Sequence, residues 1–147
     1  MPGKSDTFEL DVLKLIFNAT AISNIADNAT SSPLTNLFIS LHTADPTDAG
    51  VQDAAEANYT GYGRVAVART TGGWTCANAA GVSSAKPVSA ISFGACTGGS
   101  SAITHFSIGV ASSGASKILY SGTVSPSITV TAGITPQLTT ATSITED

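Results

Sequence analysis

The first apolar pattern along the chain is helical and lies near the N-terminus. Residues 6–26 carry apolar side chains spaced three and four residues apart: Val12, Leu15, Ile16, Ala19 and Ile22. This spacing places them on one face of a helix. Asp6 and Glu9 have the spacing of a capping box, with aspartate in place of the usual serine or threonine, so a helix start at residue 6 is predicted. Poor helix formers from Asn18 onward favour an end near residue 20, and Pro33 stops any continuation.

From Thr35 onward the apolar and polar positions alternate, which is typical of strands. The alternation is clearest in Ala102–Val110, where Phe106 and Ile108 point to one side of the strand and Ser107 to the other. Turn residues separate eight such segments. The predicted strands are Leu37–Leu41, Tyr62–Arg69, Trp74–Ala77, Lys86–Phe93, Ala102–Val110, Lys117–Tyr120, Ile128–Thr131 and Ile134–Thr140.

One helix followed by about eight short strands predicts a mainly β fold. Strands at this spacing, with turn signals between them, indicate an antiparallel β-sandwich or barrel, and eight strands fit a jelly roll. We therefore expect a jelly-roll-like β-sandwich with an N-terminal α-helix. The expected organisation is an N-terminal helical arm (1–34) and a β-sandwich domain (35–147) with a long loop at 42–61. A loop this long in a small domain usually carries interactions or function.

The composition narrows the classes of protein that the chain can belong to. Only 11% of its residues are charged, against roughly 25% in an average soluble domain. The net charge of −4 argues against a nucleic-acid partner, which calls for clustered positive charge. The chain has no apolar run long enough to span a membrane and no apolar segment typical of a secretory signal at its N-terminus.

The charges are unevenly distributed along the chain. Residues 1–56 hold eight acidic and two basic side chains, whereas residues 57–145 hold four basic and no acidic ones. One interpretation is that the acids only cap a helix and solvate a loop. The other is that the acidic part of one subunit faces the mildly basic body of the next, an arrangement that sets register and encounter rate.

A search for catalytic and metal-binding motifs identifies no enzyme signature. His42, His105, Cys76 and Cys96 lack the paired spacing of a zinc site. Both cysteines are expected to be reduced, and a Cys76–Cys96 disulfide across neighbouring strands is the alternative. The acids of the 42–61 loop do not follow the spacing of a calcium loop. Neither a nucleophile elbow nor a glycine-rich phosphate loop is present. We expect no enzymatic activity, no cofactor and no bound metal.

Carbohydrate binding is an alternative that the aromatic residues raise. Tyr59, Tyr62, Trp74 and Tyr120 could stack on sugar rings. Aromatic residues that lie within strand patterns more often pack in a core or at an interface. Packing is therefore the favoured interpretation of these four side chains.

Four blocks of sequence resemble a family of short tailed-bacteriophage virion proteins. They are Leu37–Pro46, Asn58–Val65, His105–Gly109 and Ile118–Gly122. The resemblance covers roughly residues 35–135, and members of the family are often labelled tail-fibre or tail proteins. It brings no enzymatic site with it. Small β-sandwich proteins that resemble this chain in size and strand count often serve as capsid cement at local three-fold points.

The function expected from this resemblance is a structural one in a phage virion. We expect a capsid cement or decoration protein that bridges major capsid subunits on the capsid surface, assembles as a homotrimer and is made in the host cytoplasm. The alternative is a tail, baseplate or tail-fibre component that binds a receptor through Tyr59, Tyr62 or Trp74. The candidate subunit contacts are Val12, Leu15, Ile16, Ala19, Asp45, Asp48, Tyr59 and Tyr62.

Overall fold

The computed structural model describes residues 5–22, 33–47 and 50–146. The chain folds as two compact units. Unit 1 combines the N-terminal segment to Thr35 with residues 68–90 and the C-terminal segment from Leu138. Unit 2 consists of residues 36–67 and 91–137. The predicted helical arm thus shares unit 1 with two later segments of the chain.

The helix α1 of unit 1 spans Asp6–Phe17. Its N-cap is Ser5, whose hydroxyl accepts a hydrogen bond from the Phe8 amide at 3.4 Å. The predicted start at residue 6 is therefore confirmed, but the capping residue is the preceding serine, a preferred N-cap type. The helix ends at Phe17, shortly before the end expected near residue 20, because Ala19 has a positive φ of 53°, which does not continue a right-handed helix.

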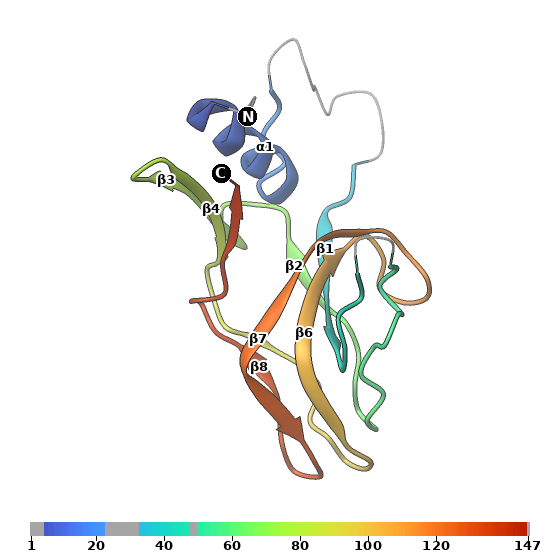
Figure 1. The fold of residues 1–147 in the computed structure, drawn as a ribbon. Helices are drawn as coiled ribbons and strands as arrows, with labels where there is room; N and C mark the ends of the chain where they lie inside the picture. The colour runs from blue at the N-terminus through green and yellow to red at the C-terminus, as the bar shows by residue number, and fades with distance from the viewer. Residues whose placement is uncertain (1–4, 23–32, 48–49, 147) are drawn as a thin grey trace. The chain divides into compact units, whose positions relative to one another are not determined.

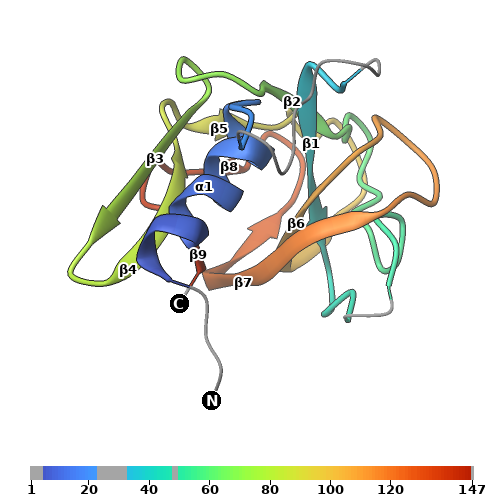
Figure 2. The same cartoon turned by 90° about the horizontal axis from the view of Figure 1, so that it is seen from above.

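Unit 1 buries a different face of α1 from the one that the sequence pattern favoured. Leu13 and Phe17 are fully buried and Glu9 is 3% exposed, and these residues lie four apart along the helix. The helix packs against β3 (Trp74–Ala79), β4 (Val82–Pro87) and β9 (Ile144–Glu146) (Figure 2). The Phe17 ring meets Trp74 edge to face, with 4.6 Å between the ring centroids.

The three strands of unit 1 form an antiparallel sheet in the order β3-β4-β9. Ala80 and Gly81 connect β3 and β4, and both have positive φ, as a tight hairpin turn requires. The predicted strand Lys86–Phe93 is wrong, because β4 ends at Pro87 and Ile91 begins the separate strand β5. Within the predicted range, Val88 is 45% exposed, whereas Ile91 is buried.

Arg69 joins the end of α1 to the rest of unit 1. Its guanidinium donates to the carbonyl oxygens of Leu15 and Ile16 at 2.7 and 2.6 Å, and to that of Leu34 at 2.7 Å. Carbonyls of a last helical turn have no partner within the helix, and a cation at this end also complements the helix dipole. Arg69 therefore acts as a C-terminal cap for α1. Burial lowers the pKa of this side chain.

We expect the substitution Arg69→Ala to destabilise unit 1 by about 1.5–3 kcal/mol, since charged hydrogen bonds are lost. The chain has one tryptophan, and Trp74 lies in unit 1, so its fluorescence during urea unfolding measures this loss. Arg69→Lys is the matched control and should recover only part of it, because an ammonium group cannot copy the guanidinium fork. An unchanged unfolding midpoint for Arg69→Ala would contradict the capping role.

Unit 2 is built on a four-stranded sheet in the order β2-β1-β6-β7 (Figure 1). The strands are β2 (Val65–Ala68), β1 (Asn36–His42), β6 (Ser101–Gly109) and β7 (Ile118–Val130). A second pair is formed by β5 (Ile91–Ser92) and β8 (Gln137–Leu138). The last residues of β2 and β8 belong to unit 1.

The pairing of β1 with β6 gives the sheet one apolar and one polar face. Ile39 lies opposite Ile108 and Leu41 opposite Phe106, whereas Ser40 lies opposite Ser107. The alternation predicted for β6 is therefore confirmed. Both faces are nevertheless buried at this point, because Ser40, His42 and Ser107 are 0% exposed. The polar face is covered by later parts of unit 2.

The mainly β, sandwich-like class with antiparallel sheets and an N-terminal helix is confirmed, with nine strands in the described part of the chain. The strands are divided among sheets of four, three and two, whereas a jelly roll has two four-stranded sheets, so a jelly roll is not confirmed. The separation of the predicted strands Lys117–Tyr120 and Ile128–Thr131 is wrong, because β7 continues through Gly122 and Pro126 between them. The predicted strand Ile134–Thr140 is reduced to β8, and β9 was not predicted.

Candidate functional site

The most elaborate arrangement of polar side chains lies within unit 2. We call it the polar cluster. Its residues come from β1, from the segment that follows β1, from β6 and from the turn before β7. The members are Ser40, His42, Gln52, Glu56, Tyr62, Arg64, Ser107 and Ser116.

The segment after β1 folds back onto the end of that strand. The amide of Thr43 donates to the carbonyl of Ala55, and the amide of Ala57 donates to that of Leu41, each at 2.8 Å. Farther along, the amide of Gln52 donates to the carbonyl of Ser116 at 2.9 Å. These backbone bonds hold much of the loop predicted at 42–61 within unit 2.

A directed chain of hydrogen bonds runs through the inner half of the cluster. His42 Nδ1 lies 2.8 Å from the carbonyl of Ala54, and a carbonyl only accepts, so Nδ1 carries the proton. His42 Nε2 then accepts from the Ser107 hydroxyl at 2.8 Å. Ser107 in turn accepts from Ser40 at 3.0 Å, and Ser40 accepts from the Gln52 amide at 2.9 Å.

Gln52 sets the direction of this chain. Its Nε2 donates to the Phe38 carbonyl as well as to Ser40, both at 2.9 Å. Its Oε1 accepts from the Ser116 hydroxyl at 2.6 Å and from Arg64 at 3.4 Å. A flipped amide would place donors against donors, so only one orientation satisfies all of these partners. Gly109 is required beside it, because an added Cβ would overlap the Gln52 side chain.

Arg64 and Glu56 form the outer half of the cluster. Arg64 Nε and Nη2 donate to the two carboxylate oxygens of Glu56 at 2.7 and 2.8 Å. The remaining guanidinium hydrogens reach the carbonyls of Ala111 and Gly114 at 3.0 and 2.9 Å and the hydroxyl of Ser116 at 3.3 Å. All five donors of the guanidinium are thus used. The Arg64 side chain is 1% exposed and that of Glu56 16%.

Tyr62 connects the ion pair to the backbone of β1. Its hydroxyl donates to Glu56 Oε1 at 2.8 Å and accepts from the Leu41 amide at 3.0 Å. Its ring lies edge to face against Tyr59 and stacks on Phe93, with centroid distances of 5.4 and 6.3 Å. Tyr62 therefore packs and hydrogen-bonds inside unit 2.

The pKa values of the cluster follow from burial and from these bonds. Burial lowers the pKa of His42, and the hydrogen bond to the Ala54 carbonyl opposes that shift only in part. Burial raises the pKa of Tyr62. The hydrogen bond to Glu56 raises the pKa of Arg64. At neutral pH the cluster therefore holds a neutral imidazole, a phenol and a charged guanidinium.

The contact between Ser107 and His42 resembles the first two members of a serine-nucleophile site. In such a site a carboxylate orients the imidazole and the serine oxygen is open to substrate. Here a backbone carbonyl takes the place of the carboxylate, and both side chains are 0% exposed. In this conformation the contact can orient the covering segment, but it cannot meet a substrate.

We expect unit 2 to lose stability in mild acid because of His42. The unfolded chain, with a histidine pKa near 6.5, takes up the proton before the folded chain does. The contribution of neutral His42 is therefore complete above about pH 6.5 and decreases below it, by at most about 1.4 kcal/mol per pH unit. Tyrosine circular dichroism during urea unfolding between about pH 7 and pH 5 measures this slope, since all three tyrosines lie in unit 2.

His42→Gln should reduce this dependence of stability on pH. His105→Gln should keep most of it, because the His42 contacts remain in place and His105 makes only the smallest of the contributions that lower the pKa of His42. A native slope that persists in His42→Gln would contradict the assignment. His105 itself lies opposite His42 in the sheet and contacts the hydroxyl of Thr104 at 2.9 Å.

The candidate subunit contacts do not come together in one site. On α1, Val12, Leu15 and Ile16 are half-buried, and Ala19, which follows the end of the helix, is exposed. In unit 2, Asp45 is exposed and its carboxylate accepts from the Thr47 amide at 2.9 Å. Asp48 lies outside the described residues. Contact of these exposed or half-buried residues with a neighbour stays a prediction.

The aromatic candidates are mostly interior. Tyr59 is 3% exposed and donates to the Gly94 carbonyl at 2.9 Å, and Trp74 is 2% exposed. The Tyr59 ring thus packs inside unit 2, and its contact with a neighbouring subunit stays a prediction. The same burial removes Tyr59 and Trp74 as stacking platforms for a sugar, and Tyr62 lies in the polar cluster.

The cysteine and metal candidates are also placed separately. Cys76 lies in β3 of unit 1 and Cys96 in unit 2, and both are free thiols. Burial raises the pKa of Cys76 to about 11. The thiol of Cys96 is directed at the carbonyls of Gly98 and Gly99. Among the described residues no three metal-ligating side chains gather.

Gln52, Glu56 and Arg64 were not predicted as a cluster from the sequence. Their spacing is irregular, and the strand pattern alone cannot show which loop covers the polar side of β1. Leu13 and Phe17 were missed as core residues because Val12 and Leu15 form a second apolar row on the same helix. A search for every row of residues four apart would have found both.

Comparison with known proteins identifies the family. A family model described as Podophage GP4 fiber I protein gp80 matches residues 4–145. No curated protein matches the chain. In the described part of the chain, the helix is too short to cross a membrane. The match spans nearly the whole chain and confirms the resemblance to a tailed-phage virion family. The chain belongs to the Podophage GP4 fiber I protein gp80 family and is a structural protein of a phage virion.

Proposed function

We propose that this protein is a structural element of the tail-fibre apparatus of a phage virion. The observation that carries the proposal is the match of residues 4–145 to a family whose description names a fibre protein. The capsid cement role expected from the sequence, with the major capsid protein as partner, becomes the alternative.

The structure supports a building block with fixed surfaces. The polar cluster ties residues 51–64 to β1, β6 and the turn before β7 through interior hydrogen bonds. Buried networks whose donors and acceptors are all satisfied make a conformation rigid. A rigid segment presents the same surface to a neighbour in every copy, which suits a repeated position in a virion.

No catalytic step is part of this proposal. The Ser107 hydroxyl and the His42 imidazole, which most resemble a catalytic arrangement, have no exposed surface. Their bonds to Ser40 and the Ala54 carbonyl leave them a role in packing. We propose that the protein functions through its contacts with copies of itself or with other virion proteins.

The test is the position of the protein on intact virions. Gold-labelled antibodies raised against the purified chain should mark the tail or its fibres in electron micrographs. Label spread over the head would overturn the fibre proposal in favour of capsid cement. Particles from a phage that lacks the gene are the control for antibody specificity, and their missing parts give a second readout of location.

A further inference from the structure

The strand β7 forms the longest sheet edge in the described part of the chain. It has 13 residues and lies at the end of the order β2-β1-β6-β7 (Figure 1). The other edge strands of the sheets of four and three strands have three to six residues. Besides their pairing with β6, residues 121–130 form no backbone hydrogen bond with another backbone group of the described chain.

This edge lacks the charges that usually keep edges apart. Natural edge strands are protected by lysines, prolines, bulges or a covering segment. No residue of β7 is charged, and Pro126 lies in the part of the strand where the pairing with β6 shifts. From Tyr120 to Thr123 the pairing is regular. The regular part therefore offers an extended edge without a charge to oppose a partner.

We infer that a second copy of this chain pairs with this edge, β7 against β7, antiparallel about a two-fold axis at Gly122. In this register Ser121 lies opposite Thr123 of the other copy, so that hydroxyl meets hydroxyl. The half-buried Tyr120 lies opposite the half-buried Val124. Pairs of hydroxyl residues and of aromatic with β-branched residues stabilise neighbouring strands.

The same register agrees with the surroundings of β7. Gly122 faces its own copy at the axis, and two glycines there allow close approach of the backbones. Lys117 precedes β7, beyond the pairing shift between Ile118 and Tyr120, and β7 itself has no charged residue, so no like charges meet within the strand pair. A one-residue change of register would set the polar row of one strand against the apolar row of the other.

The inference deepens the proposed structural role by naming the partner as a second copy of this chain. Its test is nevertheless independent of virions. If the pairing fails in solution while the antibody marks the fibres, only this inference is lost. If the label lies on the head while the pairing is observed, only the fibre location is lost.

The first experiment measures assembly of the purified chain by sedimentation equilibrium. We expect a reversible dimer. The double substitution Ser121→Lys and Thr123→Lys places like charges opposite each other twice and should raise the dimer dissociation constant at least about tenfold. The matched control adds the same two charges in an exposed turn, as Ser112→Lys and Ser113→Lys, and should leave the constant unchanged.

The second experiment fixes the register. The double substitution Ser121→Cys and Thr123→Cys should give a disulfide-linked dimer under mild oxidation, because facing positions bring the sulfur atoms within reach. The native chain, with Cys76 and Cys96, is the control for cross-links through its own thiols. A native chain that stays monomeric, a trimer, or a dimer that neither double variant affects would overturn the inference.

Discussion

Replacement of Arg64 by alanine is expected to destabilise unit 2 by about 3–5 kcal/mol, the usual cost of breaking a buried ion pair. The substitution removes all five donors of a side chain that is 1% exposed. It leaves the carboxylate of Glu56 with only the Tyr62 hydroxyl, and it removes the guanidinium donors from the Ala111 and Gly114 carbonyls. Urea unfolding followed by tyrosine circular dichroism measures the loss.

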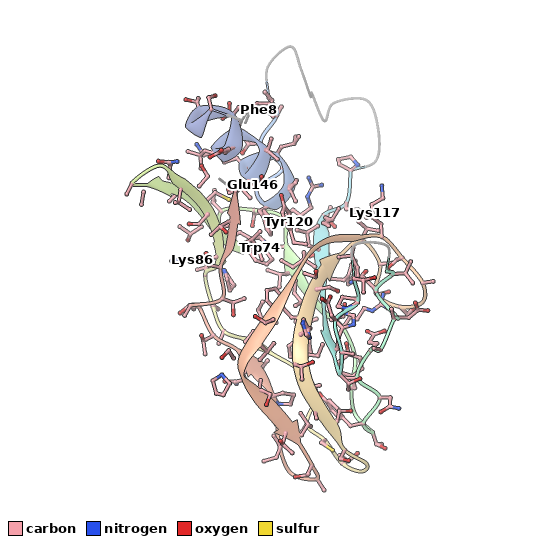
Figure 3. All side chains as sticks on the ribbon, in the orientation of Figure 1. Phe8, Trp74, Lys86, Lys117, Tyr120 and Glu146 are labelled. Atoms are coloured by element: carbon pink, nitrogen blue, oxygen red, sulfur yellow. The ribbon has the colours of Figure 1, made fainter. Side chains whose placement is uncertain are left out.

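Two variants separate the ion pair from a general loss of charge. Lys117→Ala removes an exposed cation of the same unit (Figure 3) and should change the free energy of unfolding by less than about 0.5 kcal/mol. The double variant Arg64→Met with Glu56→Gln should recover part of the loss, because no buried charge is then left alone. A loss below about 1 kcal/mol for Arg64→Ala would show that the cluster does not hold unit 2 together.

The strands that the sequence predicts best are those whose apolar and polar residues alternate regularly. Residues 105–110 alternate strictly, and β6 was found within one residue of both ends predicted for this strand. Ser40 and Ser107 show why burial is harder to predict. A serine on a strand is expected to face water, and only the covering segment with Gln52 and Arg64 makes that face interior.

The errors in the strands have local causes. Gly122 and Pro126 are turn residues by type, yet β7 passes both because an edge strand tolerates a proline that donates no hydrogen bond. At Ala80–Gly81 a real turn was not predicted. Alanine gives no turn signal, so the hairpin of β3 and β4 was missed. The pairing of β9 with β4 joins segments far apart in the sequence, which no local pattern can predict.

The relation of the polar cluster to assembly follows from its position. The cluster fixes the segment that covers the polar side of β1 and β6, and β7 is the next strand of the same sheet. Because the covering segment is held rigidly on this sheet, the backbone of its edge strand β7 is expected to keep one conformation. Loss of Arg64 is therefore expected to weaken pairing through β7 as well as the stability of unit 2.

Replacement of Phe17 by alanine is expected to cost unit 1 about 3–5 kcal/mol, the usual range for deleting a buried aromatic ring. Phe17 is fully buried and meets Trp74 at 4.6 Å, so the substitution leaves a cavity under the last turn of α1. Trp74 fluorescence during urea unfolding measures the loss, because this is the only tryptophan of the chain.

The matched control for Phe17→Ala is Phe8→Ala on the same helix. Phe8 is 40% exposed, and Figure 3 shows it on the outer side of α1, away from Trp74. Its removal should cost about 1–2 kcal/mol, less than the loss for Phe17→Ala, because part of the Phe8 ring is already in water. Equal losses for the two variants would mean that α1 does not pack on its Glu9–Leu13–Phe17 row. The predicted contact residues Val12 and Leu15 lie on the other row of the helix. Equal losses would therefore also contradict the prediction that these two residues contact a neighbouring subunit.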